Sequence, residues 1–189
     1  MALSDAQADK TPQLFGHPRG LTYLFTTEMA ERFSYYGMRA ILVLYLTNYL
    51  LLHPTVDGVW GYAPIKHLLE LIFNGGGPLG VQPLSSTIYG AYTALVYLTP
   101  FFGGIIADRW LGQRYSVIVG GVIMAIGEFV LMAPQAMFLG LLMLIVGNGF
   151  FKPNISTQVG NLYKAGDSRI DRAYSIFYVG INVGAFFSP

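Results

Sequence analysis

Four ionisable side chains interrupt an otherwise apolar stretch, about residues 21–52, that is long enough to span a bilayer. A helix would place Glu28, Glu31, Arg32 and Arg39, together with Tyr35, on a single face. A charge at the centre of a bilayer costs about 2.5–3.5 kcal/mol on insertion scales, so these groups must face a protein interior or a water-filled cavity. Ionisable groups at this depth indicate a functional site, and a purely structural cluster of ion pairs is the alternative.

The composition is typical of a polytopic α-helical membrane protein. Mean hydropathy is +0.50. Only 11% of the residues are charged, against about 25% in soluble domains. The net charge of +1 gives no reason to expect a nucleic-acid partner. The absence of cysteine excludes disulfides and thiolate metal sites, and we expect neither a metal nor another cofactor.

Hydropathy and turn residues divide the chain into a polar tail over residues 1–20 and a transmembrane bundle over residues 21–189. The predicted spans cover about residues 21–52, 87–106, 116–132, 136–163 and 174–189. Residues 53–86 form an outer loop, in which residues 62–73 predict an amphipathic helix on the membrane surface or against the bundle. Residues 108–115 form a short turn. The predicted fold class is therefore an all-α membrane protein with five transmembrane helices, and the lipid bilayer is its expected surroundings.

The distribution of Lys and Arg predicts a multi-pass protein of the cell membrane with a cytoplasmic N-terminus. The segments that would then be cytoplasmic hold most of the basic residues, and the outer loop holds only Lys66. The cytoplasmic set consists of Lys10, Arg19, Arg109, Arg114, Lys164, Arg169 and Arg172. Many secondary transporters contain two six-helix halves, and we expect this chain to be the N-terminal part of such a protein, with the C-terminal half as its partner.

Lys152 is a second ionisable group at membrane depth, in the fourth predicted span. Pro153 removes a backbone hydrogen bond directly beside it. An isolated ammonium is too costly there, so we expect Glu28 or Glu31 as its partner, which requires the first and fourth spans to meet. Protonation of a glutamate would then release Lys152 or Arg32 to bind an anionic ligand. A static salt bridge is the alternative.

In the last predicted span, Asn182 lies between Gly180 and Gly184. This G-x-x-x-G spacing predicts close packing against another helix. We expect the packing to bring the Asn182 amide against that neighbour.

Four motifs resemble those of the proton-dependent oligopeptide transporters, a branch of the major facilitator superfamily. The first is Glu28-x-x-Glu31-Arg32-Phe-x-Tyr35-Tyr36-Gly37, and the second is Gly103-Gly104-x-x-x-Asp108-Arg109-x-x-Gly112-x-Arg114 after Tyr97. The third is Lys152-Pro153, and the fourth is Phe177-Tyr178-x-x-Ile181-Asn182-x-Gly184. The resemblance implies the N-terminal helical bundle of that superfamily.

The resemblance also implies a role for each matching residue. Arg32 and Lys152 would bind the C-terminal carboxylate of a peptide, and Glu28 and Glu31 would join them in a proton-coupling network. The residues that would line the peptide cavity are Arg32, Tyr35, Tyr36, Arg39, Tyr97, Lys152 and Asn182. The residues that would form a conformational latch on the cytoplasmic side are Asp108, Arg109 and Arg114.

The expected function is proton-coupled symport of di- and tripeptides by alternating access, with the peptide amino terminus bound by the C-terminal half. A transporter of nitrate or another small anion on the same scaffold stays open, because an Arg/Lys site does not by itself demand a peptide. A membrane-embedded enzyme and a purely structural membrane subunit are further alternatives. The sequence contains no nucleophile–base or metal-ligand arrangement, so we do not expect an enzyme.

Overall fold

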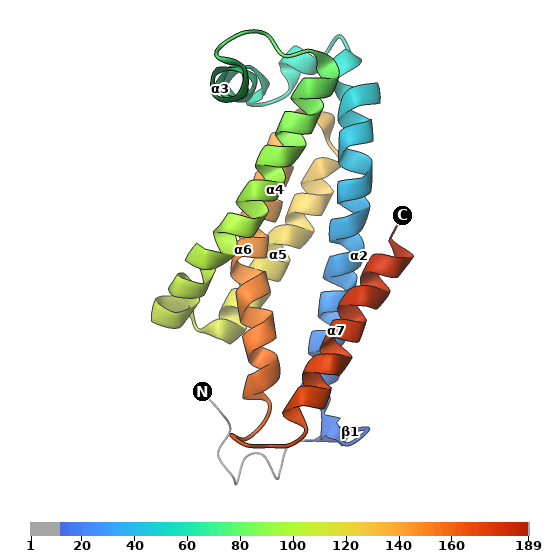
Figure 1. Ribbon diagram of the computed structural model, residues 1–189, viewed down its shortest axis with the longest axis vertical. Helices are drawn as coiled ribbons and strands as arrows, with labels where there is room; N and C mark the ends of the chain where they lie inside the picture. The colour runs from blue at the N-terminus through green and yellow to red at the C-terminus, as the bar shows by residue number, and fades with distance from the viewer. Residues whose placement is uncertain (1–11, 189) are drawn as a thin grey trace. The chain divides into compact units, whose positions relative to one another are not determined.

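The computed structural model describes residues 12–188, and helices make up most of it (Figure 1). The first part of the predicted polar tail, with Lys10, and the terminal Pro189 lie outside the described residues. The helices are α2 (Arg19–Asn48), α3 (Tyr62–Asn74), α4 (Val81–Ile106), α5 (Gln113–Leu131), α6 (Met137–Asn161) and α7 (Ile170–Phe187). Two short strands, β1 (Gln13–Leu14) and β2 (His17–Pro18), pair antiparallel before α2.

Within residues 12–188, three helical segments are long and apolar enough to cross a membrane. They are Val81–Leu111, Gln113–Leu131 and Pro134–Asn161. Helix α2 is 30 residues long, but its ionisable residues lower its hydropathy. Helix α7 is short, with Asp171 and Arg172 in its first turn. Membrane crossing by α2 and α7 stays a prediction.

The structure differs most from the prediction at the two ends of α4. Helix α4 begins at Val81 and not near residue 87, since Pro83 is tolerated in a first turn whose N–H groups have no intrahelical acceptor. The first residues of the turn predicted over 108–115 instead belong to one π-helical turn, Ala107–Leu111 (η3), which continues the helix. The Gly112 N–H donates to the Ala107 carbonyl at 2.8 Å, and Gly112 then ends the segment at φ +73°.

The chain forms two compact units, one made of Met1–Ala40 with Asn154–Pro189 and the other of Ile41–Pro153. In the first unit, α7 runs beside the first half of α2 (Figure 1). A Cβ on Gly180 would lie 2.8 Å from the Phe25 ring, and a Cβ on Gly184 would contact the Met29 carbonyl. The G-x-x-x-G pair therefore packs α7 closely against α2, as its spacing predicted.

The second unit contains α4, α5 and α6 as far as Pro153, and these helices approach one another backbone to backbone at paired glycines. A Cβ on Gly103 of α4 would contact the Gly149 carbonyl of α6. On α5, a Cβ at Gly120 would lie 2.6 Å from the Gly147 carbonyl of α6, and one at Gly127 would lie 3.3 Å from the Gly140 carbonyl. We call these the three glycine contacts. Side chains such as Val96 and Phe151, each 1% exposed, fill the core around them.

Candidate functional site

The first candidate site is a buried ionic cluster on α2 formed by Glu28, Glu31 and Arg32. One turn separates Glu28 from Arg32, and the Arg32 Nε lies 3.2 Å from the Glu28 Oε1. The same Nε also donates to the Glu31 carboxylate. The three side chains are only 4–9% exposed. Buried charges are tolerated when they are paired in this way, so the cluster is electrostatically coupled.

Arg32 has donor capacity that its two acids do not use. Its Nη2 is buried and has no hydrogen-bond acceptor among residues 12–188. A guanidinium donates through five N–H groups in a planar fork, so one edge can hold the glutamates while another binds a carboxylate. This nitrogen is the feature of the cluster that points to an anionic ligand.

Tyr35 connects the cluster to Arg39. The Arg32 guanidinium lies 5.0 Å from the centre of the Tyr35 ring, and the Arg39 guanidinium lies 5.4 Å from the same ring. Tyr36 packs edge-on against Tyr35 at 5.3 Å. Tyr35 is only 8% exposed. It therefore holds the two arginines by cation–π contact, in addition to any contact with a ligand.

Helix α7 reaches α2 directly at this cluster. A Cβ on Gly184 would lie 3.0 Å from the Arg32 Cβ. Asn182, in contrast, is exposed, and its Nδ2 donates to the Tyr178 carbonyl of its own helix at 2.9 Å. The prediction that this amide lies against a neighbouring helix was wrong, because the two glycines face α2 while Asn182 lies half a turn away from both.

The second candidate site lies in the other unit, around Lys152 of α6. The Lys152 Nζ lies 4.9 Å from the centre of the Tyr97 ring of α4. One turn before Lys152, the buried Asn148 donates to the Val96 carbonyl at 3.0 Å. Its Oδ1 is buried without a donor within the described part of the chain. The structure thus brings together Lys152 and Tyr97, which were both predicted to line the cavity.

The other predicted roles stay predictions. The pairing of Lys152 with Glu28 or Glu31 is one of them. Asp108 and Arg109 lie on the π-helical turn and Arg114 on the first turn of α5, and all three are exposed. Their role as a latch is also untested. Between Pro12 and Ser188, no three His, Asp or Glu side chains are grouped as ligands of a metal ion.

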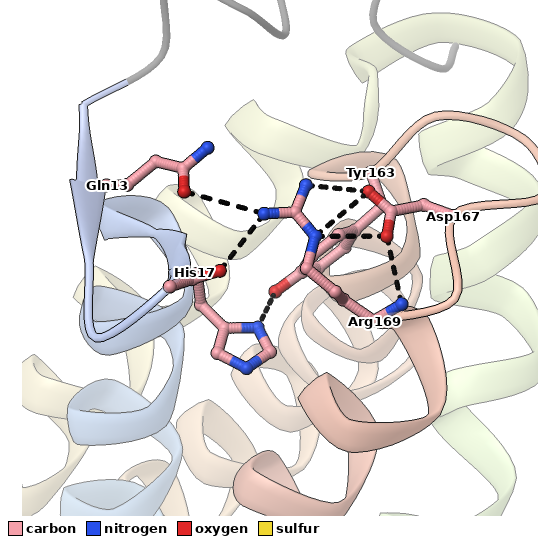
Figure 2. Close-up of polar contacts among 6 residues, drawn as sticks. Gln13, His17, Tyr163, Asp167 and Arg169 are labelled. Carbon is pink, nitrogen blue, oxygen red and sulfur yellow. Dashed lines mark hydrogen bonds and ion pairs between the residues drawn. The ribbon is translucent and has the colours of Figure 1, made fainter.

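A polar cluster that the sequence did not predict ties the β1–β2 hairpin to the segment between α6 and α7 (Figure 2). Arg169 and Asp167 form an ion pair, with Nη2 and Oδ2 2.7 Å apart. The Arg169 Nη1 also donates to the Gly16 carbonyl at 3.0 Å. The His17 Nδ1 and the Tyr163 hydroxyl lie 2.8 Å apart. We call these contacts the Arg169 tether.

Electrostatics within the Arg169 tether are strong. Hydrogen bonds from Arg169 lower the pKa of Asp167 from 3.8 to about 2. The same ion pair raises the pKa of Arg169 above its usual value. In the sequence, only the nearby acid and base at positions 167 and 169 indicated this cluster. The hairpin residues that complete it lie about 150 positions earlier in the chain, so no local pattern connects them.

Together, the apolar helices and the buried ionic cluster define an all-α membrane protein of the kind that forms secondary transporters. The family model described as "POT family" matches residues 114–189. The di-/tripeptide transporter of Lactococcus lactis subsp. lactis is 43% identical over 179 residues, which cover 93% of this chain and 32% of the relative. The peptide transporter YePEPT of Yersinia enterocolitica is 37% identical over 180 residues, 93% of this chain and 31% of the relative.

Solved structures agree with these matches. The crystal structure of a peptide transporter POT in complex with sulfate has a TM-score of 0.76 and 40% identity, and covers 100% of this chain and 35% of that one. A POT family transporter in complex with 5-aminolevulinic acid has a TM-score of 0.69 and 34% identity, and the match covers 94% of this chain and 33% of that one. The chain belongs to the POT family. It spans about a third of the length of the curated relatives that it matches.

Proposed function

We propose that this chain is the N-terminal part of a proton-coupled symporter that imports di- and tripeptides across the cell membrane by alternating access. The observation that carries the proposal is the buried Arg32 with carboxylates on its Nε and an unused donor at Nη2. The names of the relatives, which are di-/tripeptide and peptide transporters, support a peptide as the substrate.

The chemistry of the cluster suggests how a proton and a peptide are coupled. While Glu28 and Glu31 are ionised, they neutralise Arg32 and compete with any other anion for it. Protonation of either acid brings the net charge of the three groups from −1 to 0 in a site from which water is largely excluded. This removes the repulsion of an anion, and the peptide carboxylate then binds through the fork of Arg32. Proton binding and carboxylate binding therefore favour each other.

Lys152 is proposed as a second cation for the peptide carboxylate, and Tyr36, Arg39, Tyr97 and Asn182 as lining residues. The π-helical turn with Asp108 and Arg109, followed by Arg114, is proposed as the cytoplasmic latch. The amino terminus of the peptide is proposed to bind in the part of the protein that follows this chain. The N-terminus is cytoplasmic in this proposal.

The test is dipeptide uptake by the full-length protein in liposomes. Uptake driven by a proton gradient is compared with exchange of labelled for unlabelled dipeptide, which needs binding and alternation but no net proton movement. We expect Lys152→Ala to abolish both activities. We expect Glu31→Gln to abolish driven uptake while exchange persists, because glutamine removes the titratable proton but keeps the shape of the side chain.

Matched controls separate these effects from a general loss of charge. Lys66→Ala removes a cation from α3, and Asp57→Asn removes an exposed acid from the same loop. Both should transport normally. Driven uptake by Glu31→Gln at the wild-type rate would refute the coupling role. If excess unlabelled dialanine did not reduce uptake of the labelled substrate, a peptide substrate would be refuted and a small anion favoured.

A further inference from the structure

Helix α3 has an exposed apolar face that the proposed transport function does not use. Its residues Tyr62 and Leu69 are buried, at 8% and 6% exposure, and hold the helix to the rest of its unit. On a second face lie Leu68, Leu71 and Ile72, which are 53%, 57% and 61% exposed. These three residues are spaced as one stripe of a helix. A stripe of this kind facing water would be unfavourable, so it indicates a binding surface.

Hydrogen bonds place both ends of α3 at the level where two candidate membrane spans begin. Just before α3, the Trp60 N–H donates at 2.8 Å to the carbonyl of Gln135, in the first turn of the span Pro134–Asn161. Just after it, the Leu79 N–H donates at 3.0 Å to the Glu70 Oε1, two residues before the span that starts at Val81. Figure 1 shows α3, seen nearly end-on, beside the first turns of α4. The helix is therefore confined to the boundary between membrane and water.

The remaining side chains suit that boundary. Trp60, immediately before α3, is 63% exposed, and tryptophan is enriched at the headgroup level of membranes. Ala63 is exposed on a third face of the helix, away from both the buried face and the apolar stripe. Lys66 covers the Tyr62 ring at 5.8 Å with its ammonium, and Glu70 at 3.9 Å supplies an opposite charge beside it.

We propose that α3 is an interfacial helix whose Leu68, Leu71 and Ile72 face is inserted into the lipid bilayer, with Trp60 among the headgroups. The occupant of the face is lipid because the hydrogen bonds at Trp60 and Leu79 make it continuous with the apolar surfaces of two membrane spans. Insertion relies on apolar burial and not on charge, since the one lysine of the helix is paired. Binding is therefore expected in a purely zwitterionic bilayer.

The test uses single cysteines, which this chain does not contain. In the full-length protein, with any cysteine outside this chain replaced, Leu71→Cys and Ile72→Cys report on the apolar face. Ala63→Cys is the matched control on the third face. Each variant is labelled with an environment-sensitive fluorophore and placed in phosphatidylcholine nanodiscs, with or without brominated acyl chains. A wild-type thermal midpoint confirms that each labelled variant is folded.

Labels at positions 71 and 72 should emit at shorter wavelength and lose intensity with brominated lipid, but not with iodide in the water. The label at position 63 should show the reverse. Quenching of positions 71 and 72 by iodide would overturn the proposal, because the face would then be in water. Protection of both positions from both quenchers would also overturn it, because the rest of the protein would then cover the face.

Discussion

Replacing Gly184 with alanine is the smallest change that should disturb the ionic cluster without touching its charges. The added methyl group would contact the Met29 carbonyl and lie 3.0 Å from the Arg32 Cβ. The carbonyl belongs to the backbone of α2 and cannot rotate out of the way. Helix α7 must therefore move away from α2 at the turn that carries Arg32.

The expected cost follows from two opposing terms. Adding a methyl group to a well-packed contact costs about 1–3 kcal/mol, and a backbone obstacle favours the upper value of about 3 kcal/mol. Alanine is better than glycine in a helix by about 1 kcal/mol. The net loss is therefore about 2 kcal/mol, which should appear as a lower Tm.

The assay is thermal unfolding of the full-length protein in detergent, with peptide affinity as a second readout. Gly90→Ala in α4 is the matched control, because a Cβ there meets nothing within 4 Å. Its Tm should stay the same or rise. The reasoning would be refuted if Gly184→Ala and Gly90→Ala had the same Tm, since the close approach of α7 to α2 would then not restrict the position.

Three further predictions follow from the two sites and the tether. Glu28→Gln should lower stability by about 1.5–3 kcal/mol, measured by thermal unfolding, because Arg32 loses one charged acceptor but keeps a second. Because the pKa of Asp167 falls from 3.8 to about 2 on folding, its ion pair should stabilise the Arg169 tether fully above pH 3.8 and less and less towards pH 2. The protection factors of the β1–β2 hairpin amides, measured by hydrogen exchange as a function of pH, report this stability. Asp167→Asn should remove the pH dependence of these protection factors. Tyr97→Leu should weaken peptide binding about two- to fivefold, the equivalent of a cation–π contact with Lys152 of about 0.5–1 kcal/mol, while Tyr97→Phe keeps the affinity.

Each of these has a contrary result. Unchanged stability of Glu28→Gln would mean that the 3.2 Å contact is energetically neutral. If the protection of the hairpin amides fell with pH in Asp167→Asn as it does in the wild type, another group would be responsible for the titration. Equal affinities of the Leu and Phe variants at position 97 would show that the aromatic ring does not hold Lys152 in place for the ligand.

Local periodicity was enough to predict what happens within one helix. The spacing of Glu28, Arg32 and Tyr35 placed them on one face, and the structure buries all three together. The spacing of Gly180 and Gly184 predicted a close helix contact in the same way. In both cases the geometry depends only on the 3.6-residue repeat, which the sequence displays directly.

Features that depend on competing local bonds or on distant partners were not predictable. Asn182 satisfies its amide at the Tyr178 carbonyl, one turn back, and no spacing rule chooses between that bond and a neighbouring helix. Pro83 suggested a loop, but the first turn of α4 tolerates it. The Arg169 tether joins positions about 150 residues apart, and no local pattern reports such a meeting.

The three glycine contacts have a mechanical consequence. Where two backbones touch, neither helix can slide or turn past the other without first separating, and interlocked packing of this kind does not deform gradually. Helices α4, α5 and α6 should therefore travel as one stiff block in any conformational cycle, and bending should be confined to the segments that lead into and out of it.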